Sequence, residues 1–328
     1  MRFAPDPDQN ALRDGLRSLL DKRCDPAVVR AAWDPDGGAS LRSLWGELAE
    51  MGVVGLLVPE SDGGSGLDWE TAALVLEEAG RAALPLPLLE TMGIALPALI
   101  GAGDPAGVVA GVLAGEVIVA VSFDGGLAPG ATLADAAVVV GDDVTFYGPG
   151  EFSVTPAQSV DGSRRLGRIT PSAPGTPLGA LEPGQLFDLG ALGAAAELLG
   201  LGAHMLEMTV AYVKGRQQYG VPIGSFQAVK HHLADVLVGL EFARPVVAYA
   251  AYSQAQGLPD ARRAVSAAKA MAGDATTFAA RQCLQCHGAM GYTDEYDLQL
   301  WMKRAWALAA TYGGAAWHRD RVGTEMGI

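Results

Sequence analysis

The sequence has few cysteines, few cations and no strongly apolar start. Only three cysteines occur in 328 residues, an odd number, and the first residues contain no apolar signal core, so a disulfide framework is not expected. The 23 Lys and Arg residues are outnumbered by 37 Asp and Glu residues, which gives a net charge of -14. Nucleic-acid binding needs a basic stripe that displaces counterions from phosphates, so this class of partner is excluded. An anionic small ligand would require local cations and helix N-termini instead.

Long hydrophobic runs are also missing. The longest weakly polar stretch, 108–121, is rich in Gly and Ala, contains Glu116 and is shorter than a membrane span requires. We therefore expect no membrane contact and, by default, a cytoplasmic location. The spacing of the histidines and acidic residues fits no zinc site, so no metal is expected. Half of the residues are hydrophobic, which favours a folded chain over a disordered one.

The hydrophobic pattern changes twice along the chain and predicts three domains. Residues 1–115 read as an N-terminal helical domain, and residues 116–187 as a shortened middle β domain with short β-branched runs between Gly, Pro, Asp and Ser clusters. Residues 188–328 are Ala-rich and helical again. The predicted fold class is therefore mostly α, with a small antiparallel β unit and a C-terminal four-helix bundle.

Particular helices can be placed from caps and apolar spacing. Asp8 is the predicted cap of a first helix that carries Leu12 and Leu16, and Asp68 is the predicted cap of a helix that runs to Arg81. A helix between them should break at Gly52. The four helices of the bundle are expected near residues 190–215, 226–256, 260–287 and 297–312.

The stretch from Cys283 to His287 matches the haem-attachment pattern C-x-x-C-H. Haem c is attached outside the cytoplasm, and this stretch lies in an Ala-rich helical pattern. A redox pair of thiols would need an exposed, electropositive setting. The interpretation we favour is two small buried thiols on a packed helix. The other histidines, His204, His231 and His232, are expected to be packed or capping residues like His287, and His318 to lie on the surface.

Two C-terminal segments carry a stronger signal. The first reads RQQYGVPIGSFQ from Arg216 to Gln227, and the second reads QCHGAMGYTDEY from Gln285 to Tyr296. Both resemble signature segments of the acyl-CoA dehydrogenase family, which uses FAD to remove a proton and a hydride from adjacent carbons of an acyl-CoA. The order of Trp45, Pro59, Glu60 and the glycines that follow is similar to the N-terminal helical domain of that family.

The resemblance implies a set of FAD contacts directed across a subunit interface. In the family, the residues that match these segments approach the FAD of the neighbouring subunit. An arginine in the first segment can fork onto a pyrophosphate, and backbone N–H groups can support it. The implied cofactor-binding residues are Arg216, Gln218, Tyr219, Phe226, Gln227, Gln285, Gly288 and Ala289, the last in place of a common glycine.

The features that would hold the chain's own FAD do not match. The family's Thr-x-Gln positions correspond to Ala315 and Trp317, which cannot offer the same hydrogen bonds. The flavin-covering loop of the middle domain has no counterpart with its pattern here. The chain therefore resembles a subunit that completes the FAD site of a partner.

The catalytic base of the family is missing from both of its locations. Dehydrogenation beside a thioester needs a carboxylate at the α-carbon, and the two corresponding positions are Gly190 and Gly313. Glu197 lies seven residues past Gly190 and is a weak candidate for a replacement, because a lone Glu in such a helix more often pairs with a nearby polar group.

Three functions remain open from the sequence. In the first, the chain resembles the short, base-lacking subunit of heteromeric acyl-CoA dehydrogenases of the sterol side-chain type. It would then assemble with a full-length catalytic homologue as an α2β2 heterotetramer that acts on an acyl-CoA, and alone it would be inactive. In the second, it is a homo-oligomeric enzyme that uses Glu197. In the third, it is a structural or binding homologue without FAD. The retained Arg216 and Gln285 favour the first over the third.

Overall fold

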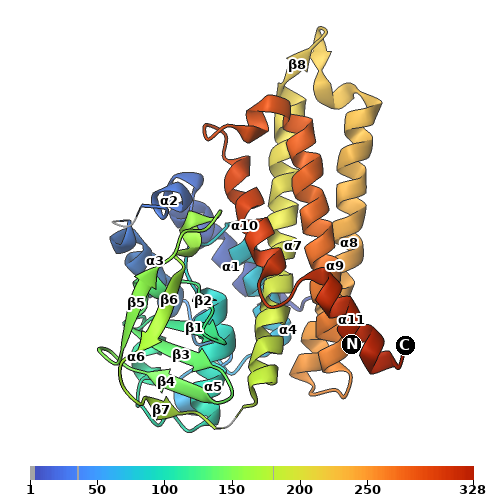
Figure 1. Cartoon of the computed structure of the whole chain (residues 1–328). Helices are drawn as coiled ribbons and strands as arrows, with labels where there is room; N and C mark the ends of the chain where they lie inside the picture. The colour runs from blue at the N-terminus through green and yellow to red at the C-terminus, as the bar shows by residue number, and fades with distance from the viewer. Residues whose placement is uncertain (1–3, 35–36, 180) are drawn as a thin grey trace. The chain divides into compact units, whose positions relative to one another are not determined.

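The computed structural model describes residues 4–34, 37–179 and 181–328. The fold is mostly helical with a small β component, as the sequence predicted (Figure 1). Contacts divide the chain into two compact units. The first comprises Met1–Pro26, Leu76–Leu84 and Ala194–Ile328, and the second comprises Ala27–Val75 and Pro85–Gly193. The three sequence domains, 1–115, 116–187 and 188–328, stay a prediction.

The N-terminal part consists of short and medium helices. They are α1 (Pro7–Arg23), α2 (Pro26–Ala31), α3 (Gly38–Glu50), η1 (Glu60–Asp62), α4 (Trp69–Arg81), the π-helical turn η2 (Leu89–Ala95), α5 (Leu96–Gly101) and α6 (Val109–Leu113). The cap of α4 is confirmed, because an Asp68 carboxylate oxygen accepts from the Thr71 N–H at 3.1 Å. The end of α3 before Gly52, whose φ is +79°, is confirmed as well.

The start of α1 was predicted two residues too late. Asp6, not Asp8, caps the helix, and its carboxylate accepts from the Gln9 N–H at 2.8 Å. The Gln9 side chain accepts in return from the Asp6 N–H at 3.0 Å, which completes a capping box. The physical reason is Pro7, which has no N–H to satisfy and is favoured at the first helical position.

Most of the β structure lies in the second unit, where it forms two small sheets. One has the order β1 (Val119–Phe123), β3 (Ala136–Val140), β4 (Val144–Tyr147) and β7 (Thr176–Pro177), and the other has the order β2 (Leu127–Ala128), β6 (Gly167–Pro171) and β5 (Phe152–Pro156). The prediction of an antiparallel unit is wrong for one pair, since β1 and β3 run parallel with Val119 opposite Ala136. Residues 124–135 leave the sheet, form β2 and η3 (Ala131–Leu133) and return, so β3 enters from the same end as β1.

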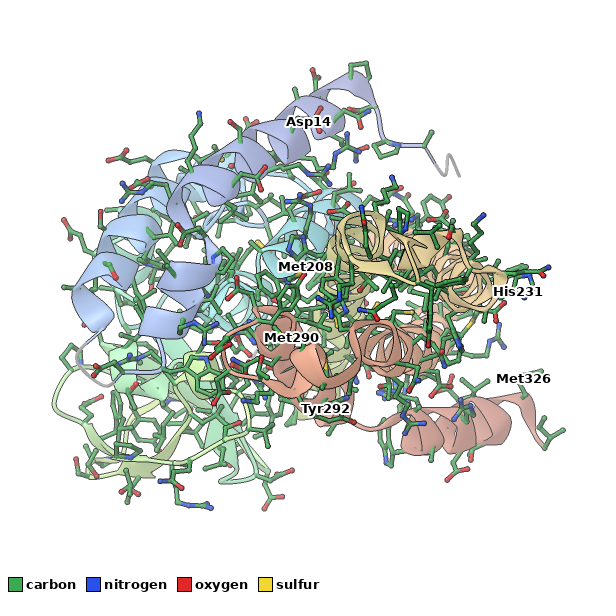
Figure 2. All side chains as sticks on the ribbon, turned by 90° about the horizontal axis from the view of Figure 1, so that it is seen from above. Asp14, Met208, His231, Met290, Tyr292 and Met326 are labelled. Atoms are coloured by element: carbon green, nitrogen blue, oxygen red, sulfur yellow. The ribbon has the colours of Figure 1, made fainter. Side chains whose placement is uncertain are left out.

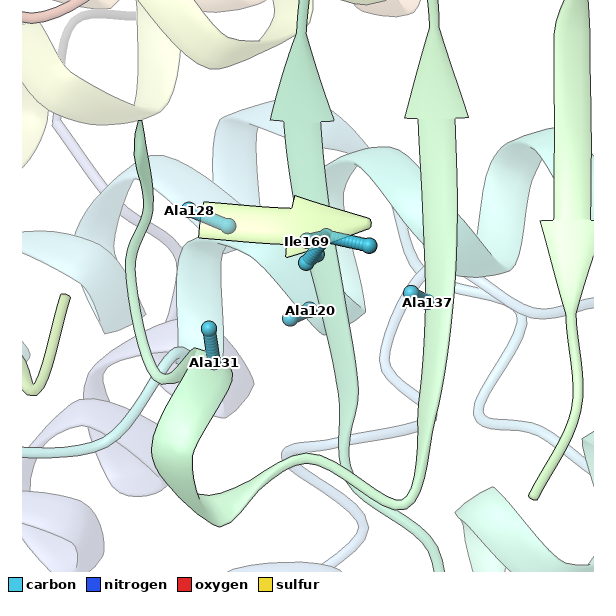
Figure 3. Close-up of a cluster of buried hydrophobic side chains, with 5 residues drawn as sticks. All are labelled: Ala120, Ala128, Ala131, Ala137 and Ile169. Carbon is cyan, nitrogen blue, oxygen red and sulfur yellow. The ribbon is translucent and has the colours of Figure 1, made fainter. Parts of the chain in front are cut away.

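Small side chains join the strands of the two sheets. Figure 3 shows the buried cluster of Ala120, Ala128, Ala131, Ala137 and Ile169, which come from β1, β2, η3, β3 and β6. Alanines let the layers approach closely, and Ile169 fills the space between them.

The first unit contains the helical bundle. Its elements are α7 (Pro183–Gly215, of which the part from Ala194 belongs here), β8 (Gln217–Gln218), β9 (Val221–Pro222), η5 (Ile223–Ser225), α8 (Gln227–Ala255), α9 (Ala261–His287), η6 (Gly288–Tyr292), α10 (Leu298–Ala310) and α11 (Ala315–Met326). The four predicted bundle helices are confirmed, and a further helix, α11, follows them (Figure 1). A buried Thr276 hydroxyl on α9 donates to the Leu198 carbonyl of α7 at 2.7 Å and ties these two helices together.

Helix α7 is unusually apolar. Within the described ranges it is the one helix long and hydrophobic enough to cross a membrane, and 83% of its most apolar window is buried inside the protein. Burial of that kind is what the central helix of a packed bundle needs.

Helices α4 and α7 cross at two glycines. A Cβ on Gly200 would overlap the Glu77 carbonyl oxygen and lie 2.6 Å from the Arg81 nitrogen. A Cβ on Gly80 would overlap the Glu197 carbonyl oxygen and lie 2.7 Å from the Glu197 Cα. The two backbones are therefore in direct contact, and no larger residue fits at either position.

Replacing Gly200 tests this crossing. Gly200→Ala should lower the free energy of unfolding by about 1–3 kcal/mol or more, because a methyl group inserted against backbone atoms forces the helices apart. The matched control is Gly273→Ala in the interior of α9, where a Cβ would meet nothing within 4 Å. It should raise stability by up to about 1 kcal/mol, because Ala loses less backbone entropy than Gly. Both values can be measured by urea unfolding, and equal effects of the two substitutions would contradict the crossing.

Candidate functional site

The two motif segments meet at one end of the bundle. Helix α7 ends at Gly215, directly before the first segment, and α9 ends at His287, inside the second. The Tyr212 ring of α7 stacks on the His287 ring of α9 with centroids 4.2 Å apart. The residues that the sequence predicted as cofactor-binding are thus brought to a shared end, where β8 is labelled in Figure 1.

The first segment is a tight hairpin. The Arg216 N–H donates to the Tyr212 carbonyl at 2.8 Å, and the Ile223 N–H donates to the Arg216 carbonyl at 2.8 Å. Between them β8 and β9 pair in antiparallel fashion, and the turn passes through Tyr219 and Gly220 with φ of +55° and +79°. The hairpin presents the Tyr219 side chain, which is 94% exposed.

The second segment follows an abrupt helix end. Gly288 has a φ of +61°, and its N–H bonds to the Gln285 and Leu284 carbonyls, which closes α9. Figure 2 labels Met290 and Tyr292 on the turn that follows. All eight predicted cofactor-binding residues share one property, exposure to solvent: Arg216, Gln218, Tyr219, Phe226, Gln227, Gln285, Gly288 and Ala289.

The cysteines of this region are inert. Cys283 and Cys286 are buried and carry no disulfide. Burial raises the pKa of Cys283 to about 12 and also raises the pKa of Cys286, so neither is a ready thiolate. The interpretation of two packed thiols is confirmed.

Most of the histidine predictions hold, and two do not. His287 is buried, and His204 packs on Trp301 with centroids 4.6 Å apart. His231 is exposed on the outer side of α8 (Figure 2) and lies inside the helix, whose cap is Phe226, so its prediction as a packed or capping residue is wrong, whereas His232 is half-buried. His318 was predicted on the surface and is instead fully buried, because α11 packs against α9.

A buried polar cluster holds the turn before α11. Tyr312 and Gly313 have φ of +54° and +88°. The Lys269 ammonium group donates to the Ala309 carbonyl at 2.9 Å and to the Gly313 carbonyl at 3.0 Å. Nε2 of His318 is 2.8 Å from the Tyr312 carbonyl, which can only accept, so this nitrogen carries the proton.

The remaining contact of the His318 ring follows from that tautomer. Nδ1 of His318 lies 3.1 Å from the Ser266 hydroxyl and accepts a hydrogen bond from it. Sequence reasoning missed Lys269 and Ser266. The available signal was the position of Lys269, because it lies on the same face of α9 as the buried Val265 and Ala272.

The predicted positions of the base have no carboxylate. Gly313 has no room for one, since a Cβ there would lie 2.8 Å from the Trp317 ring and 3.0 Å from Nε2 of His318. Gly190 is buried in α7. Glu197 is half-buried, and its backbone contacts Gly80. Its role as a base stays a prediction. Across the described residues, no group of three or more His, Cys, Asp or Glu side chains is placed to hold a metal ion.

Comparison with known proteins shows the family. The model of the acyl-CoA dehydrogenase N-terminal domain matches residues 6–107, and that of the C-terminal domain matches residues 183–327. The chain is 37% identical to acyl-CoA dehydrogenase IpdE2 of Mycobacterium tuberculosis over 305 residues, which cover 92% of each protein. It is 35% identical to IpdE2 of Mycolicibacterium smegmatis, covering 93% of this chain and 94% of that protein. The chain belongs to the acyl-CoA dehydrogenase family.

Solved structures agree with this assignment. A variant of the Tcur3481-Tcur3483 steroid ACAD superposes with a TM-score of 0.87 and 25% identity, covering 98% of each chain. The ChsE4-ChsE5 complex from Mycobacterium tuberculosis gives a TM-score of 0.88 at 24% identity, covering 100% of this chain and 99% of that one, and shows the shared fold.

The buried His318 predicts a loss of stability in acid. Burial is the main cause that lowers its pKa to about 4; the Lys269 and Arg321 cations act in the same direction, and the hydrogen bond to the Tyr312 carbonyl acts against them. The unfolded chain binds this proton below a pH of about 6.5, and the folded chain does not. Stability should therefore be full above a pH of about 6.5 and fall as the pH drops toward 4, by on the order of 2–4 kcal/mol from this residue.

Urea unfolding between pH 7 and 4.5 measures this slope. His318→Gln should flatten it, and His231→Gln, which changes an exposed histidine, should leave it as in the wild type. An unchanged slope in His318→Gln would show that other groups cause the acid sensitivity.

Proposed function

We propose that this chain is a subunit of an FAD-dependent acyl-CoA dehydrogenase that completes the FAD site of a full-length catalytic partner. Its own catalytic glutamate is missing, and the assembly is an α2β2 heterotetramer. The steroid acyl-CoA dehydrogenase similarity supports a steroid-derived acyl-CoA as the substrate class. The observation that carries the proposal is the exposure of all eight FAD-directed residues at one end of the bundle.

The residues present fit a dinucleotide cofactor held from one side. Arg216 offers a planar fork for a pyrophosphate, which matters in a chain with a net charge of -14. Gln218 and Gln285 offer amide donors and acceptors at the surface, and the turn after α9 is exposed at Gly288 and Ala289. FAD, when bound, supplies the acceptor for the hydride, and this chain contributes binding and orientation.

The lack of a base supports assignment of proton abstraction to the partner. Under the family correspondence, Gly313 stands where a glutamate would act, and its backbone conformation and its neighbours Trp317 and His318 leave no space for a side chain. A general base must reach within hydrogen-bond distance of the α-proton, and glycine cannot do so. The exposed Arg216 favours this reading over a homologue that has abandoned FAD.

The first test is the colour of the isolated chain. Expressed alone, it should be colourless or nearly so, and it should acquire flavin when co-expressed with its partner, because the contacts that remain point away from the chain. Absorbance near 450 nm, quantified by heat release of the flavin, measures occupancy. About one FAD per isolated chain together with acyl-CoA turnover would overturn the heteromer proposal and favour the homo-oligomer that uses Glu197.

The second test compares two substitutions in the assembled heteromer. Arg216→Ala should weaken FAD binding roughly ten- to a hundredfold, since loss of a charge-assisted hydrogen bond costs about 1.5–3 kcal/mol. Glu197→Gln should leave turnover nearly unchanged, whereas loss of a general base lowers the rate by about 10²–10⁴-fold. Arg262→Ala at the opposite end of α9 is the charge-matched control and should keep FAD affinity intact.

Two results would contradict this assignment. If Glu197→Gln abolishes dehydrogenation while FAD and assembly survive, this subunit is itself catalytic. If Arg216→Ala and Arg262→Ala retain FAD equally well, Arg216 does not contact the cofactor.

A further inference from the structure

Three aromatic rings link the ends of the helices that carry the two motif segments. Tyr212 comes from the last turns of α7, His287 ends α9, and Tyr296 follows η6. His287 contacts both tyrosines, with its ring centroid 4.2 Å from Tyr212 at 23° and 4.8 Å from Tyr296 at 50°. The two tyrosine rings also meet edge to face at 5.6 Å. His287 is 4% exposed and is the most buried of the three residues.

The orientation of the imidazole is set by its own helix. Nδ1 of His287 lies 2.8 Å from the Cys283 carbonyl, one turn earlier, and must donate because a carbonyl only accepts. Nε2 is then an acceptor, and it is buried without a hydrogen-bond partner in the described part of the chain. Burial lowers the pKa of His287, in opposition to the hydrogen bond from Nδ1, so the stacked ring is neutral. Its position is rigidly tied to the last turn of α9.

Tyr212 and His287 are each connected to one of the two motif segments. On the α7 side, the Tyr212 carbonyl accepts from the Arg216 N–H at 2.8 Å, so a shift of Tyr212 moves Arg216. On the α9 side, Gly288 directly follows His287, and the turn folds back so closely that a Cβ on Gly291 would lie 3.1 Å from the His287 Cβ.

We propose that His287 is the positioning residue that holds the Arg216 hairpin and the Gln285–Ala289 turn at a fixed spacing. The expected effect on FAD binding rests on the proposed function. The positioning of the two segments depends only on contacts within this chain and can be tested without a partner. A cofactor held from both segments needs them at the correct distance, and preorganised contacts bind more tightly than mobile ones.

The first experiment is hydrogen–deuterium exchange on the isolated full-length chain. His287→Ala should speed exchange at the amides of Arg216 and Ile223 and in residues 288–292, because both segments lose their shared support. His204→Ala is the control, since it removes a half-buried imidazole of α7 that packs on Trp301, far along the helix from Arg216. It should leave exchange at Arg216 unchanged. Equal exchange at Arg216 in the wild type and His287→Ala overturns the proposal.

The second experiment measures FAD affinity in the heteromer. His287→Ala should weaken it about three- to tenfold, the range expected for loss of an aromatic pair, and His287→Phe should restore most of the loss because it keeps the stacked ring. A loss in His287→Phe as large as in His287→Ala, or an equal loss in His204→Ala, would mean that the ring has no positioning role.

The two proposals fail separately. If exchange responds as expected but neither His287→Ala nor Arg216→Ala changes FAD affinity, the positioning role stands and the proposed function falls. If Arg216→Ala weakens FAD binding and His287→Ala changes neither affinity nor exchange, the proposed function stands and the positioning role falls.

Discussion

The first unit depends on the backbone contact between α4 and α7 at Gly80 and Gly200. Glycine weakens a helix by about 1 kcal/mol relative to alanine, so two glycines are tolerated here only because close packing offsets that cost. Side chains and carbonyls of α4 beside the crossing also bond to α1, α8 and α10. Arg17 of α1 grips Glu78 through two hydrogen bonds of 2.8 and 2.6 Å, Arg244 of α8 pairs with Glu77, and the Trp301 indole of α10 donates to the Arg81 carbonyl at 2.8 Å.

This arrangement explains how a packed bundle can hold the two motif segments together at its end. Helices α7 and α9 are held along their length by packing and by buried bonds such as Thr276 to Leu198. Their ends therefore arrive together, and the segments beyond them need only local contacts to be set in place. The Arg216 hairpin uses one backbone hydrogen bond to the Tyr212 carbonyl of its helix and one within the hairpin, from Ile223 to Arg216, and the Gly288 turn uses a glycine with a positive φ. The exposed polar and aromatic side chains of these segments therefore lie beyond the packed core and do not interrupt it.

Periodicity and capping chemistry predicted most helices. They did not predict strand direction or side-chain burial where these depend on tertiary packing. Bundle helices α7 to α10 were placed from their Ala-rich stretches, and Asp68 from its position before an apolar run. The parallel β1 and β3 pair was missed because strand direction depends on the path of residues 124–135, which carries no periodic signal. The burial of His318 was missed because it follows from the packing of α11 on α9. The predicted cofactor-binding residues came from resemblance to the family. Their shared exposure at one end became visible only in three dimensions.

At the Tyr312–Gly313 turn, both the missing carboxylate and the backbone conformation oppose a catalytic base. Both residues are left-handed, and the turn is bonded to Lys269 and His318, two buried groups with pKa values of about 8 and 4 that burial has lowered. A carboxylate introduced at Gly313 would meet the Trp317 and His318 rings and would face a strained φ. Under the proposed function, a single substitution would therefore not restore a base at this position. The polar cluster stabilises a conformation that suits glycine, so under the proposed function the absence of a base here is a property of the backbone as well as of the side chain.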